Sequence, residues 1–186
     1  MESLARLAPL DEKGVLVTVV IEAPRGSRTK PKYDDSIGAF RLNKVLPEGF
    51  AFPHDFGFVP STCGPDGDPL DVLVFAPEAL FTGCVATVRL LGVLDAEQTE
   101  DGKTERNDRL IGAVETPTRP AELSRLDELP RRRIEEIEEF FVSYNRAQGR
   151  SMRFLGRRDS AAALERIREG MKSFEDANRG TRARAG

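Results

Sequence analysis

The segment Asp66–Val74, Asp-Gly-Asp-Pro-Leu-Asp-Val-Leu-Val, places three carboxylates within six residues and then continues as an apolar strand. Carboxylates held this close repel one another and raise each other's pKa unless positive charge is nearby. Gly67 permits a tight turn, and Pro69 holds Asp68 in extended conformations, so the loop is stiff. Because the ligands are all oxygens, the pattern predicts a site for a hard cation such as Mg²⁺, which keeps coordination positions open for phosphate.

An ordinary β-hairpin is the alternative for this segment, because Asp-Gly is a common turn signal. A turn explains Asp66 and Gly67, but it gives no reason for Asp71 at the start of an apolar strand. A calcium-binding EF-hand loop is excluded, because Leu70 stands at a ligand position and no glutamate occupies the twelfth position.

The first two thirds of the chain have the pattern of strands separated by turns. From Val15 to Glu22 the side chains alternate with a period of two, and the second face ends in Glu22. We expect further strands at residues 39–46, 56–61, 70–75, 85–94 and 109–115. Many short strands with Gly and Pro turns favour a closed barrel.

The last third of the chain predicts two helices. Pro130 opens the first helix, and Gly149 lies just past its end. Asp159 or Ser160 caps the second helix. The apolar faces at helical spacing consist of Ile134, Ile137, Phe141 and Tyr144 in the first helix and of Leu164, Ile167, Met171 and Phe174 in the second.

Length and composition agree with one globular domain, since the chain has 186 residues, of which 39% are hydrophobic and 32% charged. We expect this domain to span residues 1–178, followed by a disordered basic tail at residues 179–186. Two cysteines, Cys63 and Cys84, are too few for a disulfide framework and favour a reducing, cytoplasmic setting. No signal peptide or membrane span is predicted, and the net charge of -3 provides no general attraction to nucleic acid or membrane.

The Asp66–Val74 segment resembles the signature of the soluble (family I) inorganic pyrophosphatases, a magnesium-dependent family built on a small β-barrel. Three upstream segments, Val19–Pro24, Lys32–Asp34 and Pro53–Gly57, are similar to other motifs of that family in the same order. The resemblance extends from about Val15 to Gly149. It implies a mainly β (α+β) fold, a small closed five-stranded OB-like β-barrel with extra strands and two C-terminal helices packed against it.

The resemblance also implies a reaction, the hydrolysis of inorganic pyrophosphate to two phosphates by a metal-activated water without a covalent intermediate. Two or more Mg²⁺ ions would be bound, with Mn²⁺ as a substitute. Asp68 would be the catalytic residue that accepts the proton of the water, since the family has its general base at the central carboxylate of this motif. The implied metal ligands are Glu22, Asp34, Asp66, Asp71 and Asp108.

The same resemblance assigns substrate binding to Lys32, Lys44, Arg109 and Tyr144. Positive charge on the three basic residues would stabilise the phosphate that leaves in the reaction. Each assignment has a structural alternative. Basic residues on strands usually belong to a solvated face, and the spacing of Tyr144 also fits a core position.

The chain departs from the family pattern at several positions. These changes weaken phosphate binding, because phenylalanine donates no hydrogen bond and lysine lacks the fork of arginine. The replacements are Phe52 and Phe56 for tyrosines, Asp34 for a glutamate, Lys44 for an arginine and Asn145 for the lysine that follows Tyr144.

The loop before Arg109 leaves open which residue supplies one of the metal ligands. Strict spacing puts Asn107 at a position where the family has an aspartate, with Asp108 beside it, and a bulge could bring Asp108 or Glu105 inward instead. We interpret the chain as a divergent bacterial-type member that keeps the core metal site and has a changed rim.

Two other functions stay open at this point. A hydrolase of another phosphoanhydride, a short polyphosphate or a nucleoside polyphosphate, is suggested by the missing tyrosines and the polar stretch at residues 97–105. A non-catalytic OB-type binding module is the alternative from another class, although the acidic motif opposes oligonucleotide binding. We expect pyrophosphate as the small-molecule substrate, no nucleic acid or membrane partner, and a cytoplasmic homo-oligomer.

Overall fold

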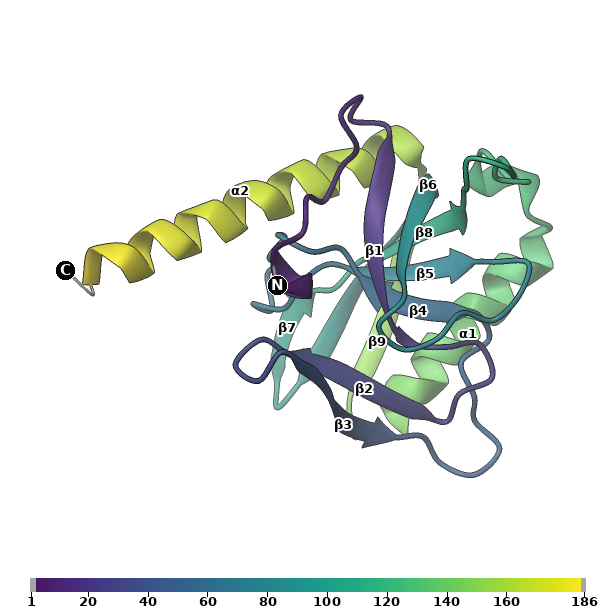
Figure 1. The fold of residues 1–186 in the computed structure, drawn as a ribbon. Helices are drawn as coiled ribbons and strands as arrows, with labels where there is room; N and C mark the ends of the chain where they lie inside the picture. The colour runs from purple at the N-terminus through teal and green to yellow at the C-terminus, as the bar shows by residue number, and fades with distance from the viewer. Residues whose placement is uncertain (1–2, 185–186) are drawn as a thin grey trace.

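The computed structural model describes residues 3–184, which form a sheet-dominated α+β fold (Figure 1). The strands in chain order are β1 (Leu16–Ala23), β2 (Thr29–Asp34), β3 (Ala39–Val45), β4 (Asp55–Phe58), β5 (Asp71–Phe75), β6 (Val85–Glu100), β7 (Lys103–Arg106), β8 (Arg109–Val114) and β9 (Ser151–Asp159). The helices are α1 (Arg131–Arg146) and α2 (Ser160–Arg184), with short 3-10 helices η1 (Leu4–Arg6) and η2 (Leu126–Glu128).

Five strands form a ring of hydrogen-bonded pairs. β1 pairs with β4, β4 with β5, β5 with β8, β8 with β6, and β6 pairs again with β1. The pair β5–β8 is parallel, and the other pairs of the ring are antiparallel. β7 and β9 pair with the long strand β6, whereas β2 and β3 form a separate hairpin that lies below the ring in Figure 1.

Alternation along the strands builds two hydrophobic cores, one on each side of the sheet. In β5, Leu73 belongs to the core that α1 covers, whereas Val72 and Val74 belong to the core that α2 covers. In α1, Phe141 packs in the first core, and in α2, Ile167 packs in the second. The two helices therefore cover opposite faces of the same strands.

Both predicted helices and the predicted strand regions are present. The predicted apolar face of α1 is buried, and the Oδ1 atom of Asp159 accepts the N–H of Ala162 at 3.0 Å, which caps α2. Three strands were not predicted. β2 contains Pro31 and has no buried residue, β7 is short and mostly polar, and β9 has Met152 as its one buried residue, so none of them shows an apolar period of two.

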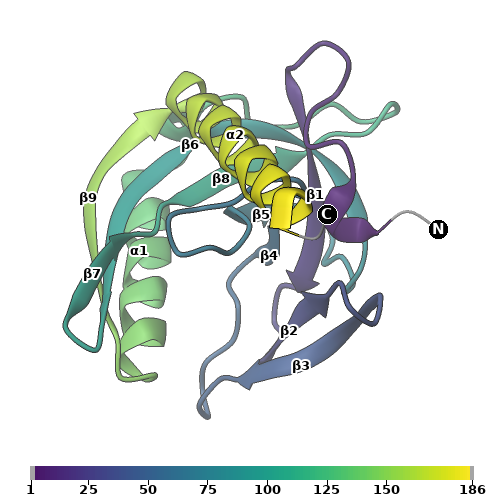
Figure 2. The ribbon, with the colours of Figure 1, turned by 90° about the vertical axis from the view of Figure 1, so that its left-hand side faces the viewer.

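Helix α2 extends past the body of the protein in Figure 1 and reaches Arg184. Residues 179–184, expected to be part of a disordered tail, therefore continue this helix, while residues 185–186 lie outside the described part. Nearer its start, α2 lies against the loop between β4 and β5 (Figure 2), where the Gly170 carbonyl accepts the N–H of Cys63 at 2.9 Å. Cys63 and Cys84 are both free, as expected. None of the helices within residues 3–184 has the length and apolar character needed to cross a membrane.

Candidate active site

The loop between β4 and β5 holds Asp66 and Asp68 in a tight turn. Gly67 adopts a φ of +81°, which glycine reaches without steric cost. The Oδ1 atom of Asp66 accepts the N–H of Asp68 at 3.1 Å, and the N–H of Gly64 donates to the Asp68 carbonyl at 2.7 Å. These local bonds fix the two carboxylates relative to each other.

Strand pairing brings Asp71 next to Arg109. Because β5 and β8 are parallel with Val72 opposite Leu110, the residues that begin the two strands lie side by side. Arg109 is 4% exposed, and its Nη1 atom lies 3.0 Å from Oδ2 of Asp71. The parallel pair thus delivers a buried cation to the third carboxylate of the motif.

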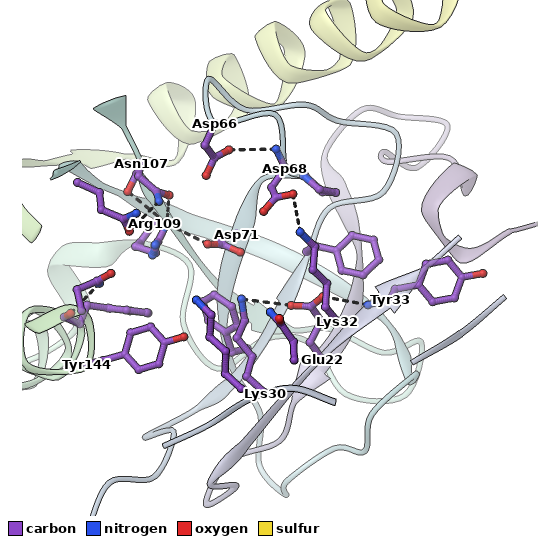
Figure 3. A pocket seen from close by; sticks show the side chains of 18 of the residues that line it. Glu22, Lys30, Lys32, Tyr33, Asp66, Asp68, Asp71, Asn107, Arg109 and Tyr144 are labelled. Atoms are coloured by element: carbon purple, nitrogen blue, oxygen red, sulfur yellow. Dashed lines mark hydrogen bonds and ion pairs between the residues drawn. The ribbon is translucent and has the colours of Figure 1, made fainter. Parts of the chain in front are cut away.

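These side chains line a cavity of about 280 Å³ between the motif loop, the β2–β3 hairpin and α1 (Figure 3). Lys32 enters it from β2, and its Nζ atom donates to Oδ1 of Asp68 at 2.6 Å. Most of the predicted site residues are therefore brought together. Those that line this cavity are Glu22, Lys32, Lys44, Asp66, Asp68, Asp71, Arg109 and Tyr144.

Two predicted metal ligands, Asp34 and Asp108, do not line the cavity. Asp34 accepts hydrogen bonds from Ser36 and from Arg41 at the end of the hairpin, and these hydrogen bonds, with Ser36 as the larger cause, lower its pKa. Asp108 points to the other side of the sheet. Its Oδ1 atom accepts the N–H of Ala96 at 2.8 Å, and Oδ2 accepts from Arg166 of α2 at 3.0 Å.

Of the three alternatives in the loop before Arg109, the structure places Asn107 at the cavity. The side-chain oxygen of Asn107 accepts a short hydrogen bond from Nη1 of Arg109, and its Nδ2 atom donates to Gln98 at 3.3 Å. A neutral amide therefore stands at the position where the family resemblance implies an aspartate. Glu105 lies outside this cavity, and its Oε1 atom is 2.5 Å from Nζ of Lys103.

Two cationic residues of the cavity were missed from the sequence, Lys30 and Arg150. The Nζ atom of Lys30 lies 3.5 Å from Oε2 of Glu22 and 4.8 Å above the ring of Phe56. Its position two residues before Lys32 on a strand is a signal that could have found it, since such residues share a face. Arg150 follows the turn after α1, and only the tertiary fold brings it to the cavity.

The carboxylates of the cavity repel one another, and the pKa values of two of them are raised. Burial raises the pKa of Glu22; the charge of Lys30 opposes this rise and that of Asp71 adds to it. Burial likewise raises the pKa of Asp66, and the charges of Asp71 and Asp68 contribute in the same direction. Both effects disfavour the ionised carboxylates in a site without enough positive charge.

The pKa values of Lys30 and Lys44 in the cavity are shifted in opposite directions. Burial by itself would lower the pKa of Lys30, but the negative charges of Asp71 and Glu22 outweigh it, so this pKa is raised. Lys44 shows the opposite result. Burial, together with the positive charges of Arg150 and Lys30, lowers the pKa of Lys44 to about 8.

The donor set of the cavity fits a hard divalent cation. Among residues 3–184, no three His, Cys, Asp or Glu side chains are arranged to hold a metal ion, and the Lys32 ammonium and the Arg109 guanidinium contact two of the motif carboxylates instead. Nevertheless, five carboxylates line one cavity, those of Glu22, Asp35, Asp66, Asp68 and Asp71, and the pKa values of Glu22 and Asp66 are raised. Oxygen donors of this kind suit Mg²⁺ or Mn²⁺, whose charge would relieve the repulsion.

Comparison with known proteins agrees with these features. The family model described as inorganic pyrophosphatase matches residues 19–175. The inorganic pyrophosphatase of Thermus thermophilus is 37% identical over 171 residues, covering 90% of this chain and 95% of that protein. That of Synechocystis sp. is 34% identical over 167 residues, covering 90% of this chain and 96% of that protein.

Solved structures agree as well. The crystal structure of inorganic pyrophosphatase from Thermus thermophilus has a TM-score of 0.83 at 35% identity and covers 94% of this chain and 99% of that one. The structure of an inorganic pyrophosphatase from Neisseria gonorrhoeae has a TM-score of 0.81 at 29% identity, covering 91% of this chain and 96% of that one.

Proposed function

This chain belongs to the inorganic pyrophosphatase family, and we propose that the cavity lined by Asp66, Asp68 and Asp71 is its active site. The chain is a metal-dependent inorganic diphosphatase that hydrolyses pyrophosphate. The observation that carries the location of the site is the convergence of the three motif carboxylates with Lys32 and Arg109 on one cavity.

Glu22, Asp66 and Asp71 would hold the metal, which we propose to be two or more Mg²⁺ ions, with Mn²⁺ as a substitute. When bound, these ions supply positive charge to the phosphate oxygens and make water more acidic. Asp34 and Asp108 have no part in this proposal, because their carboxylates are already occupied by other side chains outside the cavity.

Asp68 is the proposed general base. The oxygen of the attacking water forms a bond to one phosphorus, the bridging P–O bond breaks, and the water proton goes to the carboxylate of Asp68. Lys32 holds that carboxylate through the 2.6 Å hydrogen bond to Oδ1. No Ser, Thr, Cys or His is among the described residues that line the cavity, which supports direct attack by water.

The cationic side chains bind and orient the substrate. Lys32, Lys44 and Arg109 would contact phosphate oxygens, and their charge stabilises the phosphate that leaves. Tyr144 is 7% exposed, and Figure 3 shows its hydroxyl on the side of the cavity that Lys30 also reaches. This hydroxyl would donate a hydrogen bond to an oxygen of the phosphate that leaves.

We also propose the finer architecture and setting. The ring of strands β1, β4, β5, β8 and β6 would be a closed OB-like barrel, and residues 1–178 would form one pyrophosphatase-like domain. Two free cysteines suit the cytoplasm. Exposed apolar side chains such as Phe81, at 67%, and Leu42, at 60%, support a homo-oligomer.

The test is a phosphate-release assay on the purified protein with pyrophosphate and Mg²⁺. We expect rapid release from pyrophosphate and slower release from tripolyphosphate and from nucleoside triphosphates. Absence of release from pyrophosphate, or a clear preference for another phosphoanhydride, would contradict the proposed function. Chelation of the metal should abolish release, and added Mg²⁺ should restore it.

A further inference from the structure

The turn between β7 and β8 directs successive side chains to opposite faces of the sheet. Asn107 and Arg109 line the active-site cavity (Figure 3), whereas Arg106 and Asp108 line a separate cavity of about 400 Å³ beside α2. Nη1 of Arg109 donates to the backbone carbonyls of Asn107 at 3.2 Å and of Asp108 at 3.0 Å, and it lies 3.0 Å from Oδ2 of Asp71. The backbone of this turn therefore determines where the guanidinium of Arg109 lies.

The carboxylate of Asp108 anchors this turn from the other face of the sheet. Its Oδ1 atom accepts the N–H of Ala96 in β6 at 2.8 Å and Nε–H of Arg106 in β7 at 2.6 Å. Its Oδ2 atom accepts from Nε of Arg166 in α2 at 3.0 Å. The side chain of Asp108 is 8% exposed, and hydrogen bonds between ionised groups are stronger than neutral ones. One buried carboxylate thus joins two strands and a helix behind the turn.

Arg166 belongs to a network of ion pairs on this face. Besides Asp108, its guanidinium lies 3.2 Å from Oε2 of Glu169 and 3.8 Å from Oδ1 of Asp95. Arg106 contacts the same two aspartates, at 2.7 Å from Asp95 and 2.6 Å from Asp108. Removing one partner of a buried ion pair leaves an uncompensated charge, which is strongly destabilising. Loss of Arg166 should therefore disturb Asp108 and the turn that it anchors.

Helix α2 also contacts the back of the motif loop. The Gly170 carbonyl accepts the N–H of Cys63 at 2.9 Å, and a Cβ atom at Gly170 would lie 2.8 Å from Cδ1 of Leu70. Arg166 and Gly170 are four residues apart, so they lie on the same side of the helix. One side of α2 therefore contacts both segments that contribute residues to the active-site cavity, the motif loop and the β7–β8 turn.

We propose that Arg166 and Asp108 are positioning residues of the active site. Through their ion pair, α2 fixes the β7–β8 turn, and this turn holds Arg109 where it contacts the substrate. This inference rests on the proposed function. Neither Arg166 nor Asp108 lines the active-site cavity, so both act through Arg109. The alternative is a purely structural role, in which the ion pair only stabilises the packing of α2 on the sheet.

The experiment compares Arg166→Met and Asp108→Asn with the wild type. Calorimetry with imidodiphosphate, a pyrophosphate analogue with a nitrogen bridge, measures the dissociation constant in the presence of Mg²⁺. Phosphate release from pyrophosphate measures KM and kcat separately. We expect both variants to raise the dissociation constant and KM about tenfold, because a small displacement of a group that contacts the substrate is costly.

A double-mutant cycle tests whether the effect passes through Arg109. In an Arg109→Met background, Arg166→Met should change the dissociation constant by less than about twofold, because the group that it positions is already absent. A purely structural role predicts no such dependence on residue 109. Arg168→Met, at an exposed position of the same helix, is the matched control and should keep wild-type constants. Arg166→Lys keeps the charge and should recover most of the affinity.

The proposal is overturned if folded Arg166→Met and Asp108→Asn bind the analogue with wild-type affinity, even when they lose thermal stability, since that result assigns the structural role. It is also overturned if Arg166→Met weakens binding by the same factor with and without Arg109. If one variant does not fold, the remaining variants decide. Binding of the analogue needs no turnover. A wild type that binds it but releases no phosphate from pyrophosphate would therefore contradict the proposed function and not this inference.

Discussion

The Nζ atom of Lys32 lies 2.6 Å from Oδ1 of Asp68, so the proposed general base is held by a cation from another element. Lys32 belongs to the β2–β3 hairpin, whereas Asp68 belongs to the loop between β4 and β5. Their hydrogen bond joins the two walls of the cavity on the side where the motif turn lies. It orients the carboxylate without burying it, since the side chain of Asp68 remains 57% exposed.

The first prediction concerns Asp68→Asn. The amide keeps the shape of the side chain but accepts no proton, so kcat should fall about 100-fold or more. Mg²⁺ affinity should change little, because Glu22, Asp66 and Asp71 are retained. Phosphate release and calorimetry with Mg²⁺ check the two statements. Asp176→Asn, on an exposed side of α2, should keep the wild-type rate, and a wild-type rate for Asp68→Asn would remove this residue from its role.

The motif turn could be predicted from sequence because its geometry is local. Asp66, Gly67 and Asp68 are ordered by bonds within the turn, and Asp71 begins the strand that the apolar run predicts. The loop before Arg109 could not be predicted, because adjacent residues point to opposite sides of the sheet. A shift of one residue decides whether Asn107 or Asp108 faces the cavity.

Lys30 and Arg150 show the other limit of prediction from sequence. The β2–β3 register shifts between Lys30 and Pro31, and this bulge sets Lys30 opposite Lys44. Strand β9, which follows Arg150, has a burial pattern in which most residues are exposed, so its sequence does not indicate a strand. The place of Arg150 at the cavity depends on tertiary packing, for which the local sequence carries no signal, whereas the spacing of Lys30 from Lys32 is a local signal for the face but not for the partner Lys44.

The second prediction concerns Gly57, where β4 approaches β1. A Cβ atom at this position would lie 2.1 Å from the carbonyl oxygen of Val20, and backbone cannot move aside as a side chain does. We expect Gly57→Ala to lower the free energy of unfolding by about 3 kcal/mol or more, measured by urea denaturation. Gly156→Ala is the matched control, because nothing lies within 4 Å of a Cβ atom there. Equal stabilities of the two variants would show that the β1–β4 contact is looser than described.

The third prediction concerns the pH dependence of stability through His54, which is 9% exposed and packs against Phe75 with ring centroids 4.0 Å apart. Burial, with smaller contributions from the charges of Arg133 and Arg25, lowers the pKa of His54 to about 4. Between this pKa and the unfolded value of about 6.5, the unfolded chain binds more protons than the folded one. The contribution of His54 therefore makes the protein more stable as the pH rises through that range, and acid reverses it.

The variant His54→Phe isolates this effect, because it keeps the aromatic contact and removes the titration. The free energy of unfolding of the wild type relative to this variant should increase by about 3 kcal/mol between pH 4 and pH 7. Chemical denaturation at several pH values gives the two curves. Parallel curves over this range would mean that protonation of His54 does not destabilise the folded protein.

The last prediction uses the lowered pKa of Lys44, which burial and the charges of Arg150 and Lys30 bring to about 8. Lys44 is charged below this pH and neutral above it, so its attraction for phosphate is present at low pH and is lost as the pH rises through about 8. The ratio kcat/KM reports groups of the free enzyme, and for the wild type it should fall by about fivefold to tenfold between pH 7 and pH 9. In Lys44→Arg the guanidinium stays charged throughout, so that part of the fall should disappear. Both proteins meet the same ionisation of pyrophosphate and the same Mg²⁺ concentration, and the difference between their profiles therefore belongs to residue 44. Superimposable profiles would mean that Lys44 either keeps its proton in this range or does not contact the substrate.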